Sequence, residues 1–226
     1  MTGGAGDGGT GGRRGEWPFA PTGVEKVAVA ILAAGRGSRM GGETPKPLVK
    51  LQDQTLLQYS LTAAINSSLS PVLLVVGYEA ETVATTAPPG VTIIHNPHWQ
   101  QGIATSLHSA IRHLQNDNSV TALCIGLADQ PFIGAQSYQR LQAAYLQTSN
   151  QHPALFVATY AKARRNPVLI PRSLWPLALE LQGDEGARQL MKTYPVVEVG
   201  CDDTGDPFDI DTPANLGIRG ETGFLG

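Results

Sequence analysis

Apolar runs alternate with helix-like segments from residue 27 onward, and this alternation constrains the fold more than any other feature of the chain. Most of the runs are uninterrupted, as expected for strands that are covered on both faces. Alternation of this kind is typical of a sheet with helices on both sides. We therefore predict an α/β fold with a doubly wound, mainly parallel (mixed) sheet. Its expected strands span residues 27–32, 72–77, 91–96, 122–128, 154–160, 167–170 and 196–200.

The segments between these strands predict five helices, over residues 56–67, 103–115, 135–147, 174–181 and 185–192. One connection is too short for a helix, because only the basic segment AKARRN separates two apolar runs. A parallel crossover needs a dozen or more residues, whereas an antiparallel hairpin needs very few. We therefore expect a hairpin between residues 154 and 171, with a basic loop over 161–166.

The run LAAGRGSRMGGETPK directly follows the first expected strand and combines glycines with basic residues. The glycines can adopt positive φ and expose backbone N–H groups, while Arg39 and Lys46 add mobile cations. This combination is typical of a loop that binds a nucleoside triphosphate. The loop residues expected to contact the nucleotide are Ala33, Ala34, Gly35, Arg36, Gly37 and Ser38.

Two common glycine motifs do not fit this loop. A Walker loop requires G-x-x-x-x-G-K-[ST], but Lys46 is followed by Pro47 and no glycine directly precedes it. A dinucleotide fingerprint that starts with Gly35 and Gly37 requires a third glycine where Met40 stands. The loop therefore predicts a different mode of phosphate binding.

Composition bounds the remaining possibilities. Residues 1–23 contain nine glycines and no periodicity, which indicates a disordered leader before a single domain over 24–220 and a tail over 221–226. A formal net charge of −3 gives no global electrostatic reason to bind nucleic acid or an anionic membrane, and we find no transmembrane stretch. Cys124 and Cys201 have no neighbours at metal-ligand spacing, so we expect free thiols in a reducing, cytoplasmic setting.

Four further motifs follow the glycine loop in order: NPHWQQGIATSL, LADQP, GDEGAR and FDIDTPANL, which start at residues 96, 127, 183 and 208. Together the five motifs resemble the nucleotidyltransferases that attach a nucleotide to molybdopterin, most closely the molybdenum cofactor cytidylyltransferases. The resemblance covers residues 27–216 and implies a Rossmann-like nucleotidyltransferase fold. In such sheets ligands bind beyond the carboxyl ends of the strands, which is where the glycine loop and Asp129 are expected.

The resemblance also implies a Mg²⁺ ion, which binds in proteins through one or two carboxylates and substrate phosphates. Asp129 is expected to hold the metal, and Asp211 is preferred over Asp209 as the second ligand. The D-I-D spacing places both candidates on one side of an extended segment. Alternatively these aspartates are helix caps, although Thr212 could cap the helix that begins at Pro213 without them.

For the remaining motifs the resemblance assigns Gly77, Gly102 and Ser106 to the nucleotide, and Asp184 and Arg188 to the acceptor side. Trp99 is expected to anchor the core. Arg164 and Arg165 are either further contacts for the acceptor phosphate or part of a solvated loop. Asn166 stands where many relatives carry histidine.

The function implied by the resemblance is Mg²⁺-dependent transfer of CMP from CTP to the phosphate of molybdopterin, with release of pyrophosphate. Arg39, Lys46, Asp129 and Asp211 are the expected catalytic residues, and Ala34 in LAAG favours CTP over GTP. The implied partner is a molybdenum hydroxylase or its maturation chaperone. Two alternatives stay open: a sugar-phosphate or other small-molecule nucleotidyltransferase, favoured by the PKPL segment, and a non-transferring relative that serves as a maturation or binding module.

Overall fold

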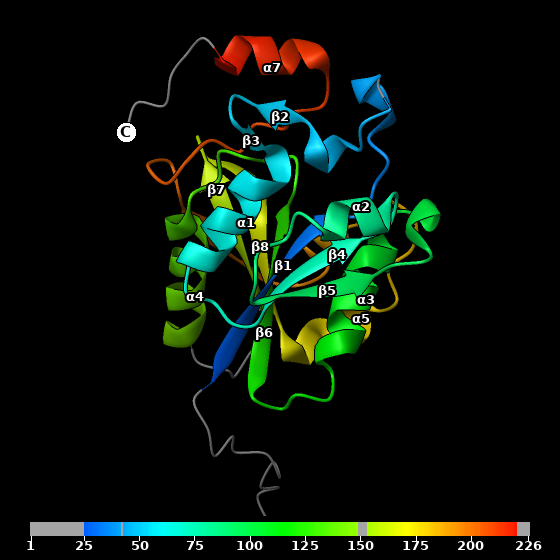
Figure 1. Cartoon of the computed structure of the whole chain (residues 1–226). Helices are drawn as coiled ribbons and strands as arrows, with labels where there is room; N and C mark the ends of the chain where they lie inside the picture. The colour runs from blue at the N-terminus through cyan, green and yellow to red at the C-terminus, as the bar shows by residue number, and fades with distance from the viewer. Residues whose placement is uncertain (1–24, 42, 149–152, 221–226) are drawn as a thin grey trace, which may run out of the picture.

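A seven-stranded mixed sheet forms the centre of the computed structural model, which describes residues 25–41, 43–148 and 153–220 (Figure 1). The expected leader over 1–23 and tail over 221–226 lie outside the described residues. The strand order is β5-β4-β1-β6-β8-β7-β9, and within the described residues β8 alone runs against the others. This confirms the predicted mainly parallel sheet. The strands are β1 (Lys26–Ala33), β4 (Val72–Val76), β5 (Val91–His95), β6 (Val120–Leu127), β7 (Leu155–Tyr160), β8 (Ala163–Pro171) and β9 (Val196–Gly200).

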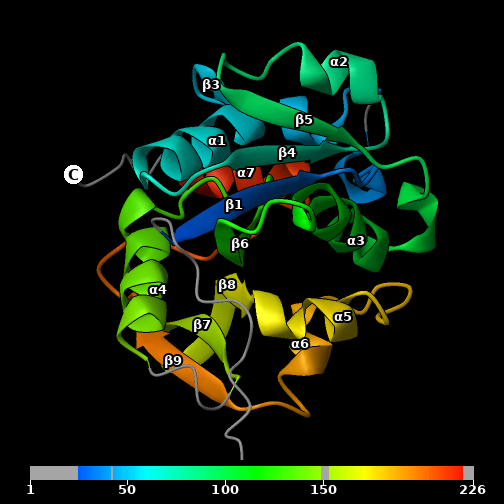
Figure 2. The ribbon, with the colours of Figure 1, turned by 90° about the horizontal axis from the view of Figure 1, so that it is seen from below.

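Helices cover both faces of this sheet (Figure 2). On one face α1 (Leu56–Asn66) and α4 (Ala135–Gln147) pack on the strands, with the short α2 (Ala80–Ala84) beside β4. On the other face lie α3 (Ile103–Leu114), α5 (Trp175–Ala178) and α6 (Ala187–Leu190). β1 is buried between its neighbours β4 and β6, and this explains its uninterrupted apolar sequence.

The sequence sets these helices locally. Thr55 and Gln58 form a capping box at the start of α1, in which each side chain accepts a hydrogen bond from the other residue's backbone N–H. In α3 the buried residues Ala104, Leu107 and Ile111 recur at spacings of three and four, so one stripe of the helix faces the sheet. Burying a leucine or isoleucine fully stabilises the fold by about 1.5–3 kcal/mol, so this stripe fixes α3 firmly.

The hairpin between β7 and β8 exists, but its loop is much shorter than predicted. Ala161 and Lys162 alone form the turn, and both have positive φ, of 47° and 64°. Such a turn matches the twist of the paired strands but usually contains Asn-Gly or Asp-Gly, so the Ala-Lys sequence gave no signal for it. The expectation of a basic loop over 161–166 is therefore wrong, and Arg164 and Arg165 belong to strand β8.

Two helices are shorter than predicted. The segment expected as a helix over 174–181 forms a 3₁₀ turn, η4 (Arg172–Leu174), and a single turn of helix, α5. The helix expected over 185–192 is reduced to α6, since the backbone of Gly186 is extended and the helix starts after it. Both segments pack against the sheet as short turns.

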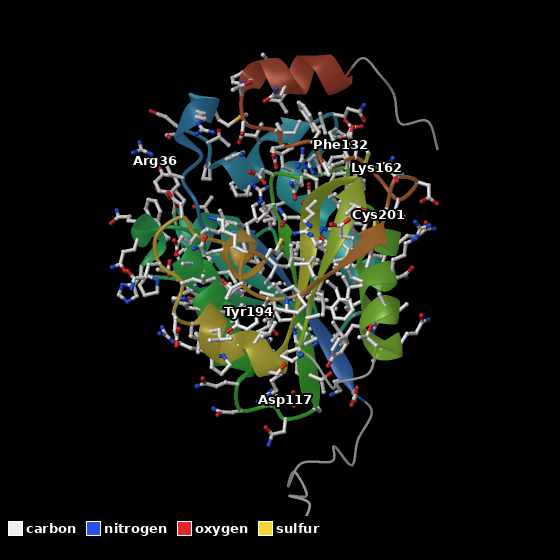
Figure 3. The ribbon with its side chains drawn as sticks, turned by 180° about the vertical axis from the view of Figure 1, so that it is seen from behind. Arg36, Asp117, Phe132, Lys162, Tyr194 and Cys201 are labelled. Carbon is white, nitrogen blue, oxygen red and sulfur yellow. The ribbon has the colours of Figure 1, made fainter. Side chains whose placement is uncertain are left out.

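A small third cluster covers the edge of the sheet where most strands end. It is built from Leu51, Leu56 and Ile210, and joins the two-stranded ribbon of β2 (Lys50–Leu51) and β3 (Gln54–Thr55) to the segment before α7 (Pro213–Gly220). Figure 1 shows α7 and this ribbon together above the sheet. In Figure 3, Arg36 and Lys162 lie toward the same end of the molecule, and Asp117 lies at the opposite end. The ribbon of β2 and β3 and the segment before α7, which are distant in the chain, thus pack together at this edge of the sheet.

Candidate functional site

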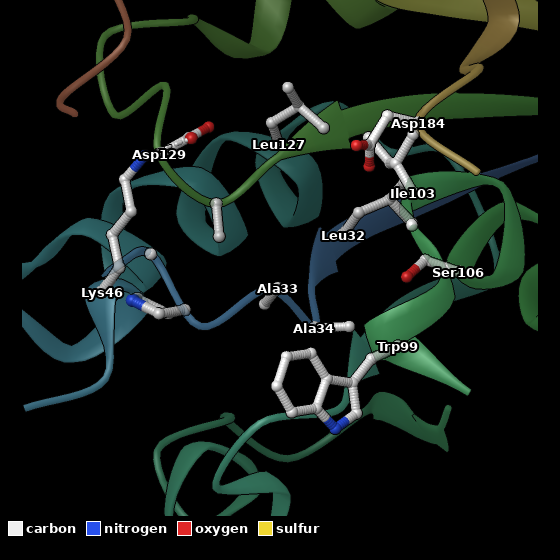
Figure 4. A pocket seen from close by; sticks show the side chains of 15 residues that line it. Leu32, Ala33, Ala34, Lys46, Trp99, Ile103, Ser106, Leu127, Asp129 and Asp184 are labelled. Carbon is white, nitrogen blue, oxygen red and sulfur yellow. Dashed lines mark hydrogen bonds and ion pairs between the residues drawn. The ribbon is translucent and has the colours of Figure 1, made fainter. Parts of the chain in front are cut away.

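A cavity of about 270 Å³ lies at the carboxyl ends of β1 and β6, and it collects residues from four of the five sequence motifs. We call it the glycine-loop cavity. Its walls come from the end of β1 and the glycine loop, from η2 (Lys46–Leu48), from the start of α3, and from the loop after β6 (Figure 4). Of the residues expected to bind the nucleotide or catalyse transfer, it contains Ala33, Ala34, Gly35, Gly37, Lys46, Gly102, Ser106 and Asp129, and it also contains Asp184, which was expected on the acceptor side.

The glycine loop positions Lys46. Gly37 has a φ of 66°, which residues other than glycine rarely adopt. A Cβ atom at position 37 would lie 2.4 Å from the Cβ of Lys46, so a side chain there would collide with the lysine stem. Gly37 therefore lets the stem of Lys46 pass directly under the loop, so that its ammonium group reaches Asp129.

The Lys46 ammonium group bridges two carboxylates. Its Nζ atom donates to Oδ2 of Asp129 and to Oδ1 of Asp211, at 2.6 Å each. The Lys46 side chain is only 10% exposed, and burial alone would lower its pKa, but the two carboxylates outweigh burial and raise the pKa. The hydrogen bond from Lys46 lowers the pKa of Asp211, which is partly exposed. Arg39 lies at the rim, largely exposed, with its guanidinium group 3.7 Å from Oδ2 of Asp211.

Asp209 is placed differently from Asp211. Its Oδ1 atom accepts a hydrogen bond from Nε2 of Gln130 at 2.8 Å, and it does not contact Lys46. Loss of hydration and the nearby charges of Asp129 and Asp211 raise the pKa of Asp209. Both D-I-D aspartates are held at the site because Ile210 between them is fully buried and its N–H donates to the carbonyl of Asp129.

The donor set fits a hard divalent cation. Oδ1 of Asp129 is buried and has no hydrogen-bond partner among the described residues. Asp129 and Asp211 already hold one cationic group between them, and hard oxygen donors of this kind suit Mg²⁺ when substrate phosphates supply further ligands. The described residues contain no group of three or more His, Cys, Asp or Glu side chains arranged to hold a metal without a substrate.

Trp99 is not a core anchor, contrary to the sequence prediction. It belongs to η3 (Trp99–Gln101), is half-buried, and lines the glycine-loop cavity opposite Lys46 (Figure 4). Its ring packs edge-to-face on Tyr78, with centroids 5.6 Å apart. Asn96 orders this loop, since its amide donates to the hydroxyls of Thr105 and Ser106 and accepts from the N–H of His98.

The GDEGAR segment closes the cavity by close backbone contact with Gly102. Gly102 has a φ of 102°, and a Cβ at this position would lie 2.2 Å from the carbonyl carbon and oxygen of Gly183. The N–H of Ala104, in the first turn of α3, donates to the same carbonyl at 3.1 Å. Glycine at position 102 therefore joins two motifs whose contacting residues, Gly102 and Gly183, are 81 positions apart, and brings Asp184 to the cavity wall.

A second cavity, of about 290 Å³, adjoins the first. We call it the carboxylate cavity, because Asp129, Asp184, Asp209 and Asp211 line it. It shares Asp129 and Asp184 with the glycine-loop cavity, and Arg188 lies on its far side. The two cavities therefore adjoin along a stretch of wall that includes Asp129.

A match to a family model shows to which protein family the chain belongs. Residues 29–199 match the family described as the MobA-like NTP transferase domain. The chain belongs to this family. It is therefore a nucleotidyltransferase by family, which agrees with the glycine loop at the mouth of the first cavity.

Individual relatives of this MobA-like domain support the same class. The purine catabolism protein PucB of Bacillus subtilis is 28% identical over 195 residues, covering 81% of this chain and 90% of PucB. The bifunctional protein GlmU of Lactococcus lactis is 30% identical over 118 residues, covering 52% of this chain and 25% of GlmU. The chain thus spans about a quarter of the length of GlmU.

Solved structures agree with the fold. The crystal structure of Rv0371c from Mycobacterium tuberculosis has a TM-score of 0.75 and 25% identity, and the match covers 88% of this chain and 100% of that one. A complex of the same protein with manganese is also known, with a TM-score of 0.69, 24% identity, and coverage of 85% of this chain and 97% of that one. None of these matches names molybdopterin or CTP, so the acceptor and the nucleotide rest on the residues themselves.

Some expected site residues of the MobA-like domain lie outside the first cavity. Gly77 follows β4 and packs under Trp99 without lining the cavity, and Arg188 lines the carboxylate cavity. Arg36 and Ser38 line a separate open hollow beside the glycine loop, where the Arg36 guanidinium lies 5.4 Å from the centroid of the Tyr78 ring. These residues lie outside the wall of the glycine-loop cavity.

Sequence reasoning missed the apolar wall of the glycine-loop cavity. Leu32, Pro47, Ile103 and Leu127 line it, alongside Trp99. The available signal was position, because Leu32, Ile103 and Leu127 lie inside the quoted motifs at the end of a strand or the start of a helix, and Pro47 directly follows one. No helix in the described part of the chain is both long and apolar enough to cross a membrane.

Proposed function

We propose that the protein transfers a nucleotidyl group from a nucleoside triphosphate, by preference CTP, to the phosphate of molybdopterin. The observation that carries this proposal is the Lys46 ammonium group held by Asp129 and Asp211 where the two cavities meet. A triphosphate under the glycine loop and an acceptor in the carboxylate cavity would have their reacting atoms beside these groups.

In the proposed reaction an oxygen of the acceptor phosphate attacks the α-phosphorus of the triphosphate. A new P–O bond forms, the bond from the α-phosphorus to the bridging oxygen breaks, and pyrophosphate leaves with the bonding electron pair. A phosphate monoester is mostly deprotonated near pH 7, so the protein needs no general base. Its contribution is positioning and neutralisation of charge.

Each part of the site has a role in this scheme. The backbone N–H groups of residues 35–38 hold the phosphates, and the apolar wall with Trp99 and Ser106 receives the base and sugar. Arg39 and Lys46 neutralise the leaving pyrophosphate. Lys46 is hydrogen-bonded to two carboxylates in the protein without substrate. To contact the pyrophosphate, its ammonium group must therefore exchange one carboxylate oxygen for a phosphate oxygen.

Asp129 and Asp211 would hold a divalent cation, with Asp209 nearby as a further carboxylate. Bound Mg²⁺ would supply charge neutralisation on the phosphate oxygens and fix their orientation. The unpartnered Oδ1 of Asp129 supports this assignment, because a buried carboxylate oxygen without a donor is costly unless a cation binds it.

The choice of CTP and molybdopterin rests on fewer residues. Ala34 is 4% exposed at the cavity wall, where a methyl group narrows the space for a base. The order of the five motifs supports the molybdopterin acceptor, and Asp184 and Arg188 face the cavity that would receive it. The buried thiols of Cys124 and Cys201 are free, which suits a reducing compartment such as the cytoplasm, with a molybdenum hydroxylase or its chaperone as the receiving partner.

The test is a panel of CTP, GTP and UTP against molybdopterin and sugar 1-phosphates, with pyrophosphate release as the readout and Asp129→Asn as the inactive control. Release with CTP and molybdopterin supports the proposal. Release with a sugar 1-phosphate alone favours the second candidate, a sugar-phosphate nucleotidyltransferase, which the Lys46–Pro47 segment also suits. No release with any pair would leave a non-transferring binding module.

A further inference from the structure

A third cavity lies beyond the carboxylate cavity and is strongly basic. It has a volume of about 240 Å³, and its lining includes Arg164, Arg165, Arg188 and Lys192 but no acidic residue. We call it the basic cavity. Its residues come from β7 and β8 and from the segment around α6, which packs on one face of the sheet (Figure 2).

Most of this positive charge is unbalanced. Nε of Arg164 donates to Oε1 of Glu198 at 2.8 Å, but the Arg165 guanidinium group donates to the backbone carbonyl of Arg164. Among the described residues, no carboxylate lies within 4 Å of Arg188 or Lys192. Four cations with one acidic partner repel one another, and a bound anion would offset that repulsion through charge-assisted hydrogen bonds.

A bulge in β8 shapes the wall between this cavity and the carboxylate cavity. Val157 of β7 pairs with Val168, whereas the next residue, Ala158, pairs with Arg165. Asn166 and the proline after it therefore have no partners on β7, and bulges of this kind redirect side chains beside functional sites. Asn166 and Val168 line both the basic and the carboxylate cavities, so the two cavities adjoin.

The position of the basic cavity separates it from the reacting atoms. The glycine-loop and carboxylate cavities share Asp129, but the described lining of the basic cavity has no residue in common with the glycine-loop cavity. An anion held there is therefore one cavity removed from the α-phosphorus. It cannot be the group that attacks.

We propose that the basic cavity binds a second anionic group of the acceptor, at the end remote from the reacting oxygen. This deepens the proposed function and rests on it. The acceptor is then an elongated molecule with a nucleophilic phosphate at one end and a further negatively charged group away from it. Arg164 and Lys192 select for that remote charge, and Arg188 lies between the two ends.

A first experiment tests the cavity without turnover. Inorganic phosphate is titrated into the full-length protein, saturated with α,β-methylene CTP, while amide shifts are followed by NMR. We expect shifts at residues 164–168 and 188–192 that disappear in the Arg164→Gln/Lys192→Gln double variant. They should persist in Lys162→Gln, which removes one positive charge at an exposed residue outside the cavity. Absent shifts, or equal shifts in the folded double variant, would overturn the inference.

A second experiment tests the substrate class with two probes that differ in one remote charge. We expect fructose 1,6-bisphosphate to bind about tenfold more tightly than fructose 1-phosphate by calorimetry, the scale of one good charge-assisted hydrogen bond. The double variant should lose this preference, and Lys162→Gln should keep it. Equal affinity for both probes in the unmodified protein counts against the inference. Failure of the nucleotide panel with these binding results intact would instead remove the proposed transfer reaction and leave the anion site.

Discussion

Replacing Lys46 by methionine should change metal affinity and turnover in opposite directions. Methionine keeps the length of the apolar stem but removes the ammonium group that Asp129 and Asp211 share at 2.6 Å. The two carboxylates then face each other without a cation. In the unmodified protein a metal ion must displace the ammonium group, whereas in the variant it meets the carboxylates directly.

We expect Mn²⁺ to bind the Lys46→Met protein about ten- to a hundredfold more tightly than the unmodified protein in the absence of nucleotide, or about 1.4–2.8 kcal/mol. Breaking a buried ion pair costs about 3–5 kcal/mol. Because both carboxylates are partly exposed and can be rehydrated, the free energy of unfolding without metal should fall by a smaller amount, about 1–3 kcal/mol. Turnover should decrease at least about a hundredfold, since charge on the pyrophosphate is no longer neutralised.

The assay is Mn²⁺ titration followed by electron paramagnetic resonance, together with urea unfolding. Lys50→Met is the matched control, because Lys50 lies four residues further along and is exposed. Unchanged or weaker Mn²⁺ binding by Lys46→Met would refute the idea that the ammonium group occupies the position of the metal.

The loss of stability should also depend on pH. The pKa of Asp211 is lowered from its ordinary value of 3.8, so its contribution is complete above that value and disappears as the pH falls through the folded pKa. The pKa of Lys46 is raised from 10.5, so its contribution is complete below that value and disappears only at higher pH. The difference between the unmodified protein and Lys46→Met should be constant from about pH 5 to 9 and shrink below about pH 4.

Three further outcomes are expected. Asp129→Asn should lower turnover at least about a hundredfold while the protein still folds, and Asp209→Asn should have the smaller effect; Mg²⁺-dependence curves for both variants check this. Ala34→Gly should narrow a preference for CTP over GTP, measured as the ratio of kcat/KM values, and a protein that already prefers GTP would contradict the cytidylyl assignment. Gly102→Ala should cost about 1–3 kcal/mol of stability, because of its φ of 102° and the contact with Gly183; an unchanged melting temperature would show that the loop can move away.

The sheet was predictable because parallel strands that are buried on both faces have continuous apolar sequences. β1 and β6 read as continuous apolar runs, and the observed strands differ from the predicted ones by one or two residues, except at the start of β8. The start of β8 was missed because its residues are basic and polar, and its turn lacks glycine and asparagine. The short α6 was overestimated because local sequence does not show that Gly186 stays extended.

Part of the site was predictable because its charged residues lie within recognisable motifs. Lys46 and Asp129 were recognised as charged residues at strand ends and Asp211 from the family resemblance, and the structure brings the three together. That Lys46 binds both carboxylates could not be predicted, because it depends on the path of the lysine stem under Gly37. Trp99 was misassigned, since an aromatic residue near a helix start looks the same in sequence whether it faces the core or a cavity.

The reversed direction of β8 has a consequence for how such an enzyme can diversify. Parallel strands deliver their last residues to the working edge of the sheet, but β8 delivers its first residues there, including Asn166. The segment that borders the carboxylate cavity therefore follows a two-residue turn and belongs to strands outside the β1–β4–β6 half, which carries the glycine loop. Mutations in this hairpin could exchange one acceptor for another during evolution while the triphosphate chemistry is inherited unchanged.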